Sequence, residues 1–137
     1  SPYDVIVAEY TARPETANQF YEQCRLLLMY YSTFGSCLYE NEKIGIKTYL
    51  VNNNCAYLLA PTPNVLKSNI SSNVDRQYGQ HMSLKVKDEA EIMLRDWLIA
   101  SAGDGKLNLH NIKSKPLLKE LINYNKIGNF DRVMALL

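Results

Sequence analysis

The chain has 137 residues, of which 47% are apolar, and its formal net charge is +1. This length suits one domain with one core, and the apolar content predicts a globular fold rather than a disordered chain. The small net charge neither indicates nor excludes nucleic-acid binding, because a basic face can coexist with an acidic site. We find no apolar run of membrane-spanning length and no signal-peptide pattern, so we expect no membrane partner.

The three cysteines, Cys24, Cys37 and Cys55, are odd in number and widely spaced, and no CxxC pair is present. This pattern argues against a zinc site and against a disulfide framework. We therefore expect reduced, mostly buried thiols in a cytosolic setting.

The first half of the chain predicts strands that alternate with helices. The β-branched run Val5–Tyr10 predicts a buried strand, and the apolar positions from Glu15 to Tyr31 recur at helical spacing. Ser36–Tyr39 predicts a second strand, Gly45–Val51 a short helix and Ala56–Leu59 a third strand. This alternation indicates an α/β fold, in which helices cover a central sheet.

The second half predicts a long loop and then mainly helices. Residues 62–82 show little periodicity, and a loop of that length is more often functional or mobile than inert. The elements predicted after it are a helix that Ser83 caps, a turn at 103–105, an edge strand at 107–109, and helices at 117–124 and 130–137.

Glu40 is the first candidate functional residue, because it directly follows the apolar run Cys37–Tyr39. Ligand sites in open α/β sheets gather at the carboxyl ends of strands, so a carboxylate there points towards bound ligands. The alternative is a solvated residue at the start of a loop, which is the commoner situation for a single glutamate.

Asp131 is the second candidate, at the start of the last predicted helix. An aspartate there usually caps the helix or interacts with its dipole. In the functional alternative it faces Glu40 across the edge of the sheet. Carboxylates brought together in this way bind Mg²⁺ or Mn²⁺, as a metal-dependent phosphodiesterase requires. The spacing alone does not show that the two side chains meet.

Other chemical signatures are weak. The sequence contains no Walker A motif, and His81 and His110 are isolated. Arg76, Lys85 and Lys87 could follow a phosphate backbone, although a solvated helix face is the commoner explanation for the two lysines.

Four stretches of the sequence share their order with one protein family: 6–14 (IVAEYTARP), 37–41 (CLYEN), 95–98 (RDWL) and 129–136 (NFDRVMAL). Together they resemble the carboxyl-terminal nuclease domain of the large terminase subunit of tailed phages, most closely the crAss-like phages of gut bacteria. The similarity extends over nearly the whole chain.

This resemblance implies a ribonuclease H-like central sheet flanked by helices, with the first strand missing or truncated. In the family, three acidic residues bind two divalent metal ions, Mg²⁺ or Mn²⁺, and the domain cuts concatemeric viral DNA. Glu40 matches the second acidic position and Asp131 the last. The first is an aspartate that proline often follows. Ser1-Pro2 stands in that place, so either Asp4 substitutes for it or the aspartate lies in residues that this chain lacks.

The resemblance also implies a single nuclease domain over residues 1–137, without the terminase ATPase domain and so without ATP hydrolysis. The implied partners are double-stranded DNA, that ATPase domain, the portal and the small terminase subunit. The implied location is the host cell cytoplasm rather than the mature virion. Two alternatives stay open: a non-catalytic ribonuclease H-like module that binds DNA or motor partners, and a junction-resolvase-like nuclease. The loop at 62–82, with Arg76, is the candidate contact with DNA.

Overall fold

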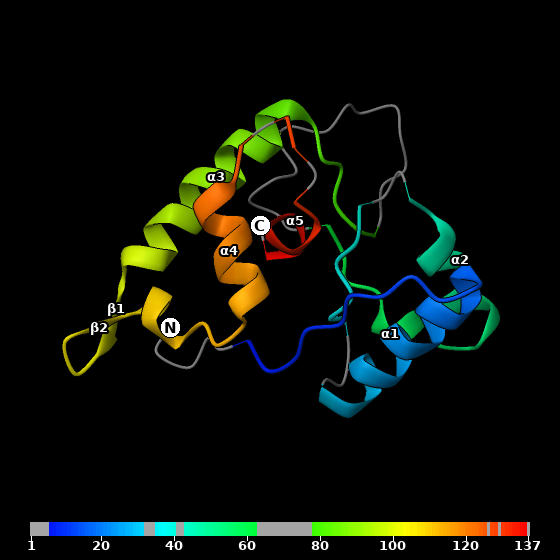
Figure 1. The fold of residues 1–137 in the computed structure, drawn as a ribbon. Helices are drawn as coiled ribbons and strands as arrows, with labels where there is room; N and C mark the ends of the chain where they lie inside the picture. The colour runs from blue at the N-terminus through cyan, green and yellow to red at the C-terminus, as the bar shows by residue number, and fades with distance from the viewer. Residues whose placement is uncertain are drawn as a thin grey trace. The chain divides into compact units, whose positions relative to one another are not determined.

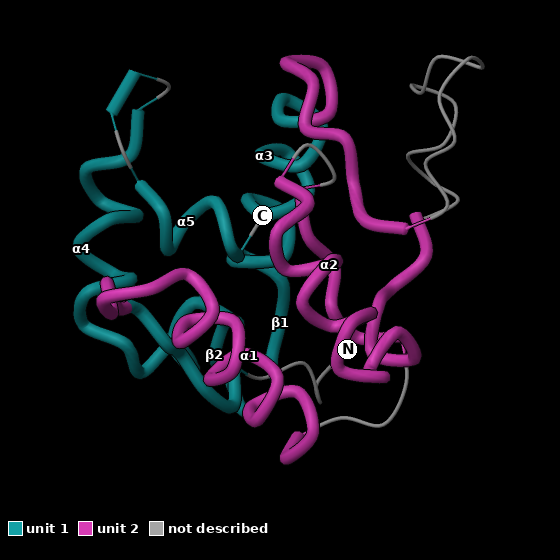
Figure 2. Tube along the Cα trace, turned by 90° about the vertical axis from the view of Figure 1, so that its right-hand side faces the viewer, with its two compact units in different colours: residues 1–11, 87–137 teal, residues 12–86 magenta. Residues whose placement is uncertain are grey.

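A computed structural model describes residues 6–31, 35–40, 43–62, 78–125, 127–128 and 130–136. These residues form a mixed fold of five α-helices and one two-stranded antiparallel sheet (Figure 1). The chain divides into two compact units, drawn in different colours in Figure 2. Unit 1 consists of residues 1–11 and 87–137, and unit 2 consists of residues 12–86.

Unit 2 contains the helices α1 (Ala17–Tyr31) and α2 (Gly45–Asn52) and the 3-10 helix η1 (Ala56–Leu58). Two reciprocal hydrogen bonds hold the start of α1. The Thr16 backbone N–H donates to Gln19 Oε1 at 3.1 Å, and the Gln19 backbone N–H donates to Thr16 Oγ1 at 3.2 Å. This capping box satisfies backbone groups that have no partner within the helix.

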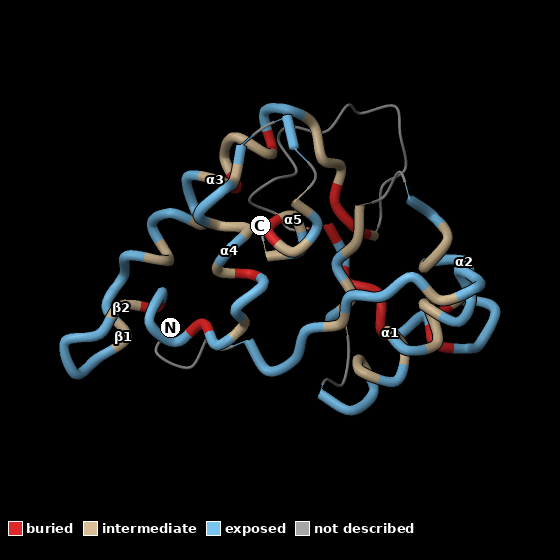
Figure 3. Tube along the Cα trace, in the orientation of Figure 1, coloured by how far each residue is buried: buried red, intermediate tan, exposed pale blue. Residues whose placement is uncertain are grey.

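The core of unit 2 is a buried cluster of Leu50, Cys55, Leu58 and Leu59 (Figure 3). Leu50 and Leu58 are completely buried. The partly buried residues that pack against this cluster come from both helices and from the segments around them; they are Leu28, Cys37, Tyr39, Ile46 and Tyr78. The cluster therefore joins α1, α2 and η1 to the extended segments of unit 2.

Three of these extended segments, residues 37–40, 59–61 and 78–80, pair through isolated β-bridges, and we call them the bridged segments. Cys37 pairs with Leu59 and Glu40 with Gln80, both in parallel, whereas Pro61 pairs with Tyr78 in the antiparallel sense. The Gln80 backbone N–H donates to Tyr39 O at 2.7 Å, and the Ala60 backbone N–H donates to Cys37 O at 2.9 Å. Backbone pairing thus places Glu40 next to a residue far away in the sequence.

Helix α3 leads from unit 2 into unit 1. The elements are α3 (Leu84–Ile99), β1 (Ser101–Gly103), β2 (Lys106–Leu107), the 3-10 helix η3 (Asn108–Asn111), α4 (Lys115–Asn123) and α5 (Asp131–Leu136). Serines cap two of the helices. Ser83 Oγ accepts from the Val86 N–H and Ser114 Oγ from the Leu117 N–H, each at 3.2 Å. Both hydroxyls replace hydrogen bonds that the first helical turn lacks.

The core of unit 1 is a second buried cluster, made of Ile112, Leu117 and Val133. Side chains of α3, α4 and α5 surround it, and so do Tyr124 and Phe130, whose rings pack edge to face with centroids 5.5 Å apart. The Tyr124 hydroxyl donates to Glu91 Oε1 at 2.5 Å. This hydrogen bond, followed by burial, raises the pKa of Tyr124 to about 12. The clusters of the two units share no residue.

The structure confirms the predicted helices and the turn at 103–105, but most predicted strands are wrong. Residues 6–10 lie in no strand, and 6–9 are exposed, because an apolar run forms a strand only where a partner accepts its hydrogen bonds. Residues 56–58 form η1 instead of a strand, since the periodicity of a short apolar run does not separate the two structures. Residues 36–39 contribute only an isolated bridge. The predicted edge strand at 107–109 is confirmed only at Leu107, which ends β2, whereas Leu109 belongs to η3.

The predicted central sheet is not seen in the described residues, whose only sheet is the β1–β2 pair. The part of the predicted loop at 62–82 that the structure describes is partly ordered by pairing, because Tyr78 and Gln80 both form bridges. In the described ranges of the chain, no helix is long and apolar enough to cross a membrane.

Candidate functional site

Glu40 ends the first bridged segment, and its backbone position is fixed by pairing on both sides. Tyr39 O accepts the Gln80 N–H at 2.7 Å, and Glu40 O accepts the Lys43 N–H at 2.9 Å. The Glu40 side chain keeps 32% of its surface exposed. A carboxylate on a held backbone that still reaches solvent is available to a cation from solution.

Lys43 is the cation that lies beside Glu40 in the structure. Its Nζ atom is 3.3 Å from Glu40 Oε2, and its side chain is 81% exposed. An ion pair this exposed contributes little free energy, because water screens the charges and the lysine side chain loses entropy by staying in place. A divalent cation could therefore displace Lys43 from Glu40 at little cost.

Gln80, the bridge partner of Glu40, has an unsatisfied amide. Gln80 is 4% exposed as a whole residue, and its Nε2 atom donates to His81 O at 2.9 Å. The Oε1 atom is buried and has no hydrogen-bond partner among the described residues. Leaving a buried acceptor unpaired costs about 1–3 kcal/mol. The packing of the described residues of unit 2 does not explain this orphaned oxygen.

Gly79 allows the chain to enter this bridge. Its φ angle is +74°, and a Cβ atom at this position would lie 2.8 Å from Tyr39 O. A side chain would be strained by the backbone conformation and would also collide with the carbonyl that accepts the Gln80 N–H. Glycine at position 79 therefore permits the close approach of the segments that carry Glu40 and Gln80.

Asp131 is exposed and begins α5, as the sequence predicted. Its neighbours hold the helix in place: Val133 is 1% exposed, and Arg132 binds two glutamates. Arg132 Nη1 is 2.9 Å from Glu120 Oε2, and Arg132 Nε is 2.8 Å from Glu9 Oε1. The bonds to Glu120 and then to Glu9 raise the pKa of Arg132. The carboxylate of Asp131 thus projects from a helix that its neighbours hold firmly.

The predicted pairing of Glu40 with Asp131 stays a prediction. Glu40 belongs to unit 2 and Asp131 to unit 1, and the positions of the two units relative to one another are not determined. Asp4, the candidate for the first acidic position, and Arg76, a candidate DNA contact, lie outside the described residues.

The other two candidate DNA contacts lie in the first turn of α3, where Lys85 is exposed and Lys87 is partly exposed. Residues two positions apart on a helix point in different directions. The two lysines therefore do not form a basic patch by themselves, and their contact with DNA stays a prediction.

Glu40 and Gln80 offer oxygen ligands of the type that a hard divalent cation binds. No three His, Cys, Asp or Glu side chains gather into a possible metal site within the described ranges. Gln80 is outside those residue types, yet its orphaned Oε1 is an amide oxygen on the bridge partner of Glu40. Mg²⁺ and Mn²⁺ bind carboxylate, carbonyl and water oxygens, and Mg²⁺ commonly keeps several waters in protein sites. The sequence reasoning missed Gln80 because no local pattern marks its pairing partner.

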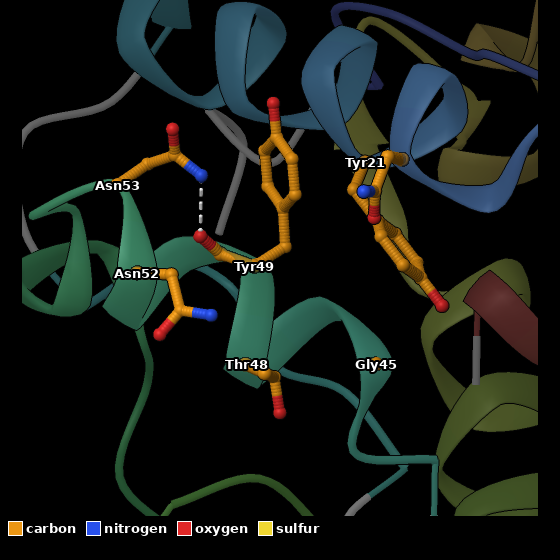
Figure 4. A pocket seen from close by; sticks show the side chains of 7 residues that line it. Tyr21, Gly45, Thr48, Tyr49, Asn52 and Asn53 are labelled. Carbon is orange, nitrogen blue, oxygen red and sulfur yellow. Dashed lines mark hydrogen bonds between the residues drawn. The ribbon is translucent and has the colours of Figure 1, made fainter.

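A pocket of about 480 Å³ lies on unit 2 (Figure 4). Its lining comes from α1, α2 and the residue that follows α2: Asn18, Tyr21, Gly45, Thr48, Tyr49, Asn52 and Asn53. None of these residues carries a charge, so the pocket offers no carboxylate to a metal ion.

Glu22 of α1 is a carboxylate that the sequence analysis did not select. It accepts hydrogen bonds from the Arg25 guanidinium and, at 2.5 Å, from the hydroxyl of Tyr49 on α2. The Arg25 bond first and the Tyr49 bond next lower the pKa of Glu22 to about 2. Because both partners stabilise the charged form, Glu22 ties α1 to α2 and is a poor proton carrier near neutral pH.

All three cysteines are free thiols in the structure. Cys55 is buried, whereas Cys24 and Cys37 are partly buried. Burial raises the pKa of Cys24, and burial followed by the neighbouring Cys24 raises the pKa of Cys37 to about 11. Thiols that keep their protons are weaker nucleophiles and weaker metal ligands than thiolates.

Comparisons of the chain with protein-family models, with curated proteins and with solved structures gave no match. The resemblance to terminase nuclease domains therefore depends on the four sequence stretches described above.

Proposed function

We propose that the chain is the metal-dependent endonuclease domain of a viral DNA-packaging terminase, with a ribonuclease H-like fold, and that it cuts concatemeric double-stranded DNA. The observation that carries this proposal is the setting of Glu40. Its carboxylate is one-third exposed at the end of a paired segment, and an unsatisfied amide oxygen belongs to its bridge partner. The four stretches that resemble the family support the same assignment.

In this proposal Glu40 and Asp131 hold Mg²⁺ or Mn²⁺, with Asp4 as the candidate for the third acidic ligand. Bound divalent ions supply activation of a water molecule for in-line attack on phosphorus and stabilisation of the leaving oxygen. Glu40 would exchange Lys43 for the metal, and the bonds of Arg132 would keep Asp131 oriented.

Arg76, Lys85 and Lys87 would contact phosphates, which carry no sequence information, so we expect cutting with little base preference. The proposed partners are those of the family: the terminase ATPase domain, the portal and the small terminase subunit, in the cytoplasm of the host cell. These partners are part of the proposal and follow from the resemblance alone.

Nicking of supercoiled plasmid in the presence of Mn²⁺ or Mg²⁺ tests the proposal. Glu40→Gln and Asp131→Asn each remove one charge with almost no change of shape, and we expect each to lower the nicking rate by at least about 100-fold. The matched controls are Glu15→Gln and Asp104→Asn, since both residues are exposed. Asparagine also tolerates the φ angle of +52° at position 104. Both controls should cut as fast as the wild type.

Each alternative function has its own result. Cutting that survives both Glu40→Gln and Asp131→Asn would show that the site assignment is wrong. Retention of DNA without cleavage, even at high Mn²⁺ concentration, would favour the non-catalytic binding module. Faster cutting of branched than of linear DNA would favour the junction-resolvase-like nuclease.

A further inference from the structure

We propose that Gln80 and Glu40 together bind the divalent cation, with Gln80 Oε1 as a neutral protein ligand beside the Glu40 carboxylate. This inference rests on the proposed metal site at Glu40, but it adds a residue for which neither the sequence motifs nor the resemblance provides a role.

The first argument is backbone geometry. Glu40 and Gln80 are partners in a parallel bridge, and opposite residues in such a pair project their side chains from the same face. Neighbouring strands lie about 4.8 Å apart, which is within reach of one shared ion for two side chains of this length. The Gln80 N–H to Tyr39 O bond of 2.7 Å keeps the segments in this register.

The second argument is the orientation of the Gln80 amide. Only the NH₂ end of an amide can donate, and Nε2 donates to the carbonyl oxygen of His81 at 2.9 Å. Turning the amide over would place Gln80 Oε1 against the carbonyl oxygen of His81, and both are acceptors. The end of Gln80 that remains is therefore an acceptor, and it needs a donor or a cation.

The third argument is the choice between explanations for the orphaned oxygen. Oε1 has less than 1 Å² of exposed surface, so bulk water does not satisfy it. An internal water or an ion is the usual explanation for a buried acceptor of this kind. A cation is favoured here because the bridge partner brings a negative charge and Gln80 brings an acceptor, so both groups attract positive charge.

Lys43 is the charged group that competes for this place. Its Nζ atom contacts Glu40 Oε2 at 3.3 Å, and the side chain is 81% exposed. Lys43 neutralises Glu40 when no metal ion is bound, and its long solvated side chain can withdraw when one arrives. Removal of the Lys43 charge should therefore increase the affinity for a divalent cation.

Mn²⁺ binding to the full chain, measured from the electron paramagnetic resonance signal of free Mn²⁺, tests the proposal without any DNA. Gln80→Met keeps the length of the side chain and removes the oxygen, and we expect at least about 10-fold weaker binding. Gln23→Met is the matched control, because Gln23 is exposed on α1, and it should bind like the wild type. Lys43→Gln should bind Mn²⁺ more tightly.

Thermal unfolding separates a ligand from a packing defect. Gln80→Met should melt close to the wild-type temperature without metal, because the removal of an unsatisfied acceptor from the interior offsets the loss of the Nε2 hydrogen bond to His81 O. Gln80→Glu sets two carboxylates side by side, so it should melt lower without metal and recover when Mn²⁺ is added. The recovery should exceed that of the wild type, because the cation then neutralises two charges.

Equal Mn²⁺ binding by wild type and Gln80→Met would overturn the inference, and so would the absence of Mn²⁺ binding at millimolar concentration. The proposed nuclease function fails separately. If Mn²⁺ binding depends on Gln80 but the chain does not cut DNA, the inference about Gln80 stands and the proposed nuclease function is wrong. If cutting depends on Glu40 but Mn²⁺ binding does not depend on Gln80, the nuclease function stands and the inference about Gln80 is wrong.

Discussion

Gly79→Ala should weaken unit 2 by disturbing the bridge between Glu40 and Gln80. The residue has a φ angle of +74°, in the left-handed region, and the new Cβ would lie 2.8 Å from Tyr39 O. That oxygen accepts the Gln80 N–H at 2.7 Å, so it cannot move away without weakening the hydrogen bond that sets the register.

The magnitude follows from these two contributions. A non-glycine residue in the left-handed region costs about 1–2 kcal/mol. Weakening the Gln80 N–H to Tyr39 O bond costs about 1 kcal/mol more. We therefore expect Gly79→Ala to lower the free energy of unfolding by about 2–3 kcal/mol, partly offset by the reduced entropy of the unfolded chain.

Gly105→Ala is the control that separates strain from collision. Gly105 has nearly the same φ angle, +72°, and nothing lies within 4 Å of its Cβ position. Urea unfolding of both variants should place Gly79→Ala about 1 kcal/mol below Gly105→Ala. In the Mn²⁺ titration, Gly79→Ala should bind more weakly than the wild type, and Gly105→Ala should be unchanged.

Two results would refute this reasoning. Equal destabilisation by the two substitutions would mean that the contact with Tyr39 O has no energetic consequence. An unchanged free energy of unfolding for Gly79→Ala would mean that the chain does not adopt the left-handed conformation at this position, and the Glu40–Gln80 bridge would lose its support.

The other predictions concern the cores and the pH dependence of stability. Leu50→Ala should lower the free energy of unfolding by about 2–5 kcal/mol in urea, and Val133→Ala by less, because it removes a smaller side chain. Hydrogen exchange should show the loss in unit 2 for the first variant and in unit 1 for the second; the reverse result would contradict the separate clusters. Glu22 has its pKa lowered from 4.5 to about 2, so its stabilising effect is present above pH 4.5 and is lost as the pH falls towards 2. The melting temperature of Glu22→Gln should lack this part of the acid dependence. A pH profile equal to that of the wild type would show that the Glu22 carboxylate does not stabilise the contact between α1 and α2. Tyr124 has its pKa raised from 10 to about 12, so its contribution is present below pH 10 and is lost as the pH rises through 12. Tyr124→Phe should lower the free energy of unfolding by about 1 kcal/mol below pH 10 and should weaken the dependence of the melting temperature on alkaline pH. No change in either quantity would show that the hydrogen bond to Glu91 contributes nothing to stability.

Helices were predictable because their signals are local. Apolar spacing located α1 and α3, and Ser83 marked the start of α3 by its ability to accept a backbone N–H. Pro116 lies in the first turn of α4, where its missing N–H has no cost. All of this information lies within a few residues of the element that it predicts.

Strands were less predictable because their partners are distant. The β-branched run at 6–10 has the composition of a strand, yet its residues pair with no strand in the described part of the chain. Cys37 and Glu40 pair with Leu59 and Gln80, and nothing in their local sequence identifies these partners. Residues 56–58 turned into η1 through the Leu58 N–H to Cys55 O bond, which no apolar pattern reveals.

The candidate site shows the same division. Its first carboxylate, Glu40, does lie at the end of a paired segment, and Asp131 does begin a helix, as their local sequence predicted. Gln80 was hidden within a predicted loop, because its importance comes from a partner far away in the chain. The unsatisfied amide oxygen is a property of three-dimensional packing, so it could be found only in the structure.

The division of the chain into units has a consequence for protein synthesis. Unit 2 is one continuous stretch, residues 12–86, whereas unit 1 joins residues 1–11 to residues 87–137. The ribosome therefore completes the whole of unit 2 before it makes Arg132, the partner of Glu9. At a translation rate of about 5–20 residues per second, the nascent chain spends a few seconds in this state. During that time the cluster around Leu50 can form, while Glu9 still lacks Arg132, its ion-pair partner on α5.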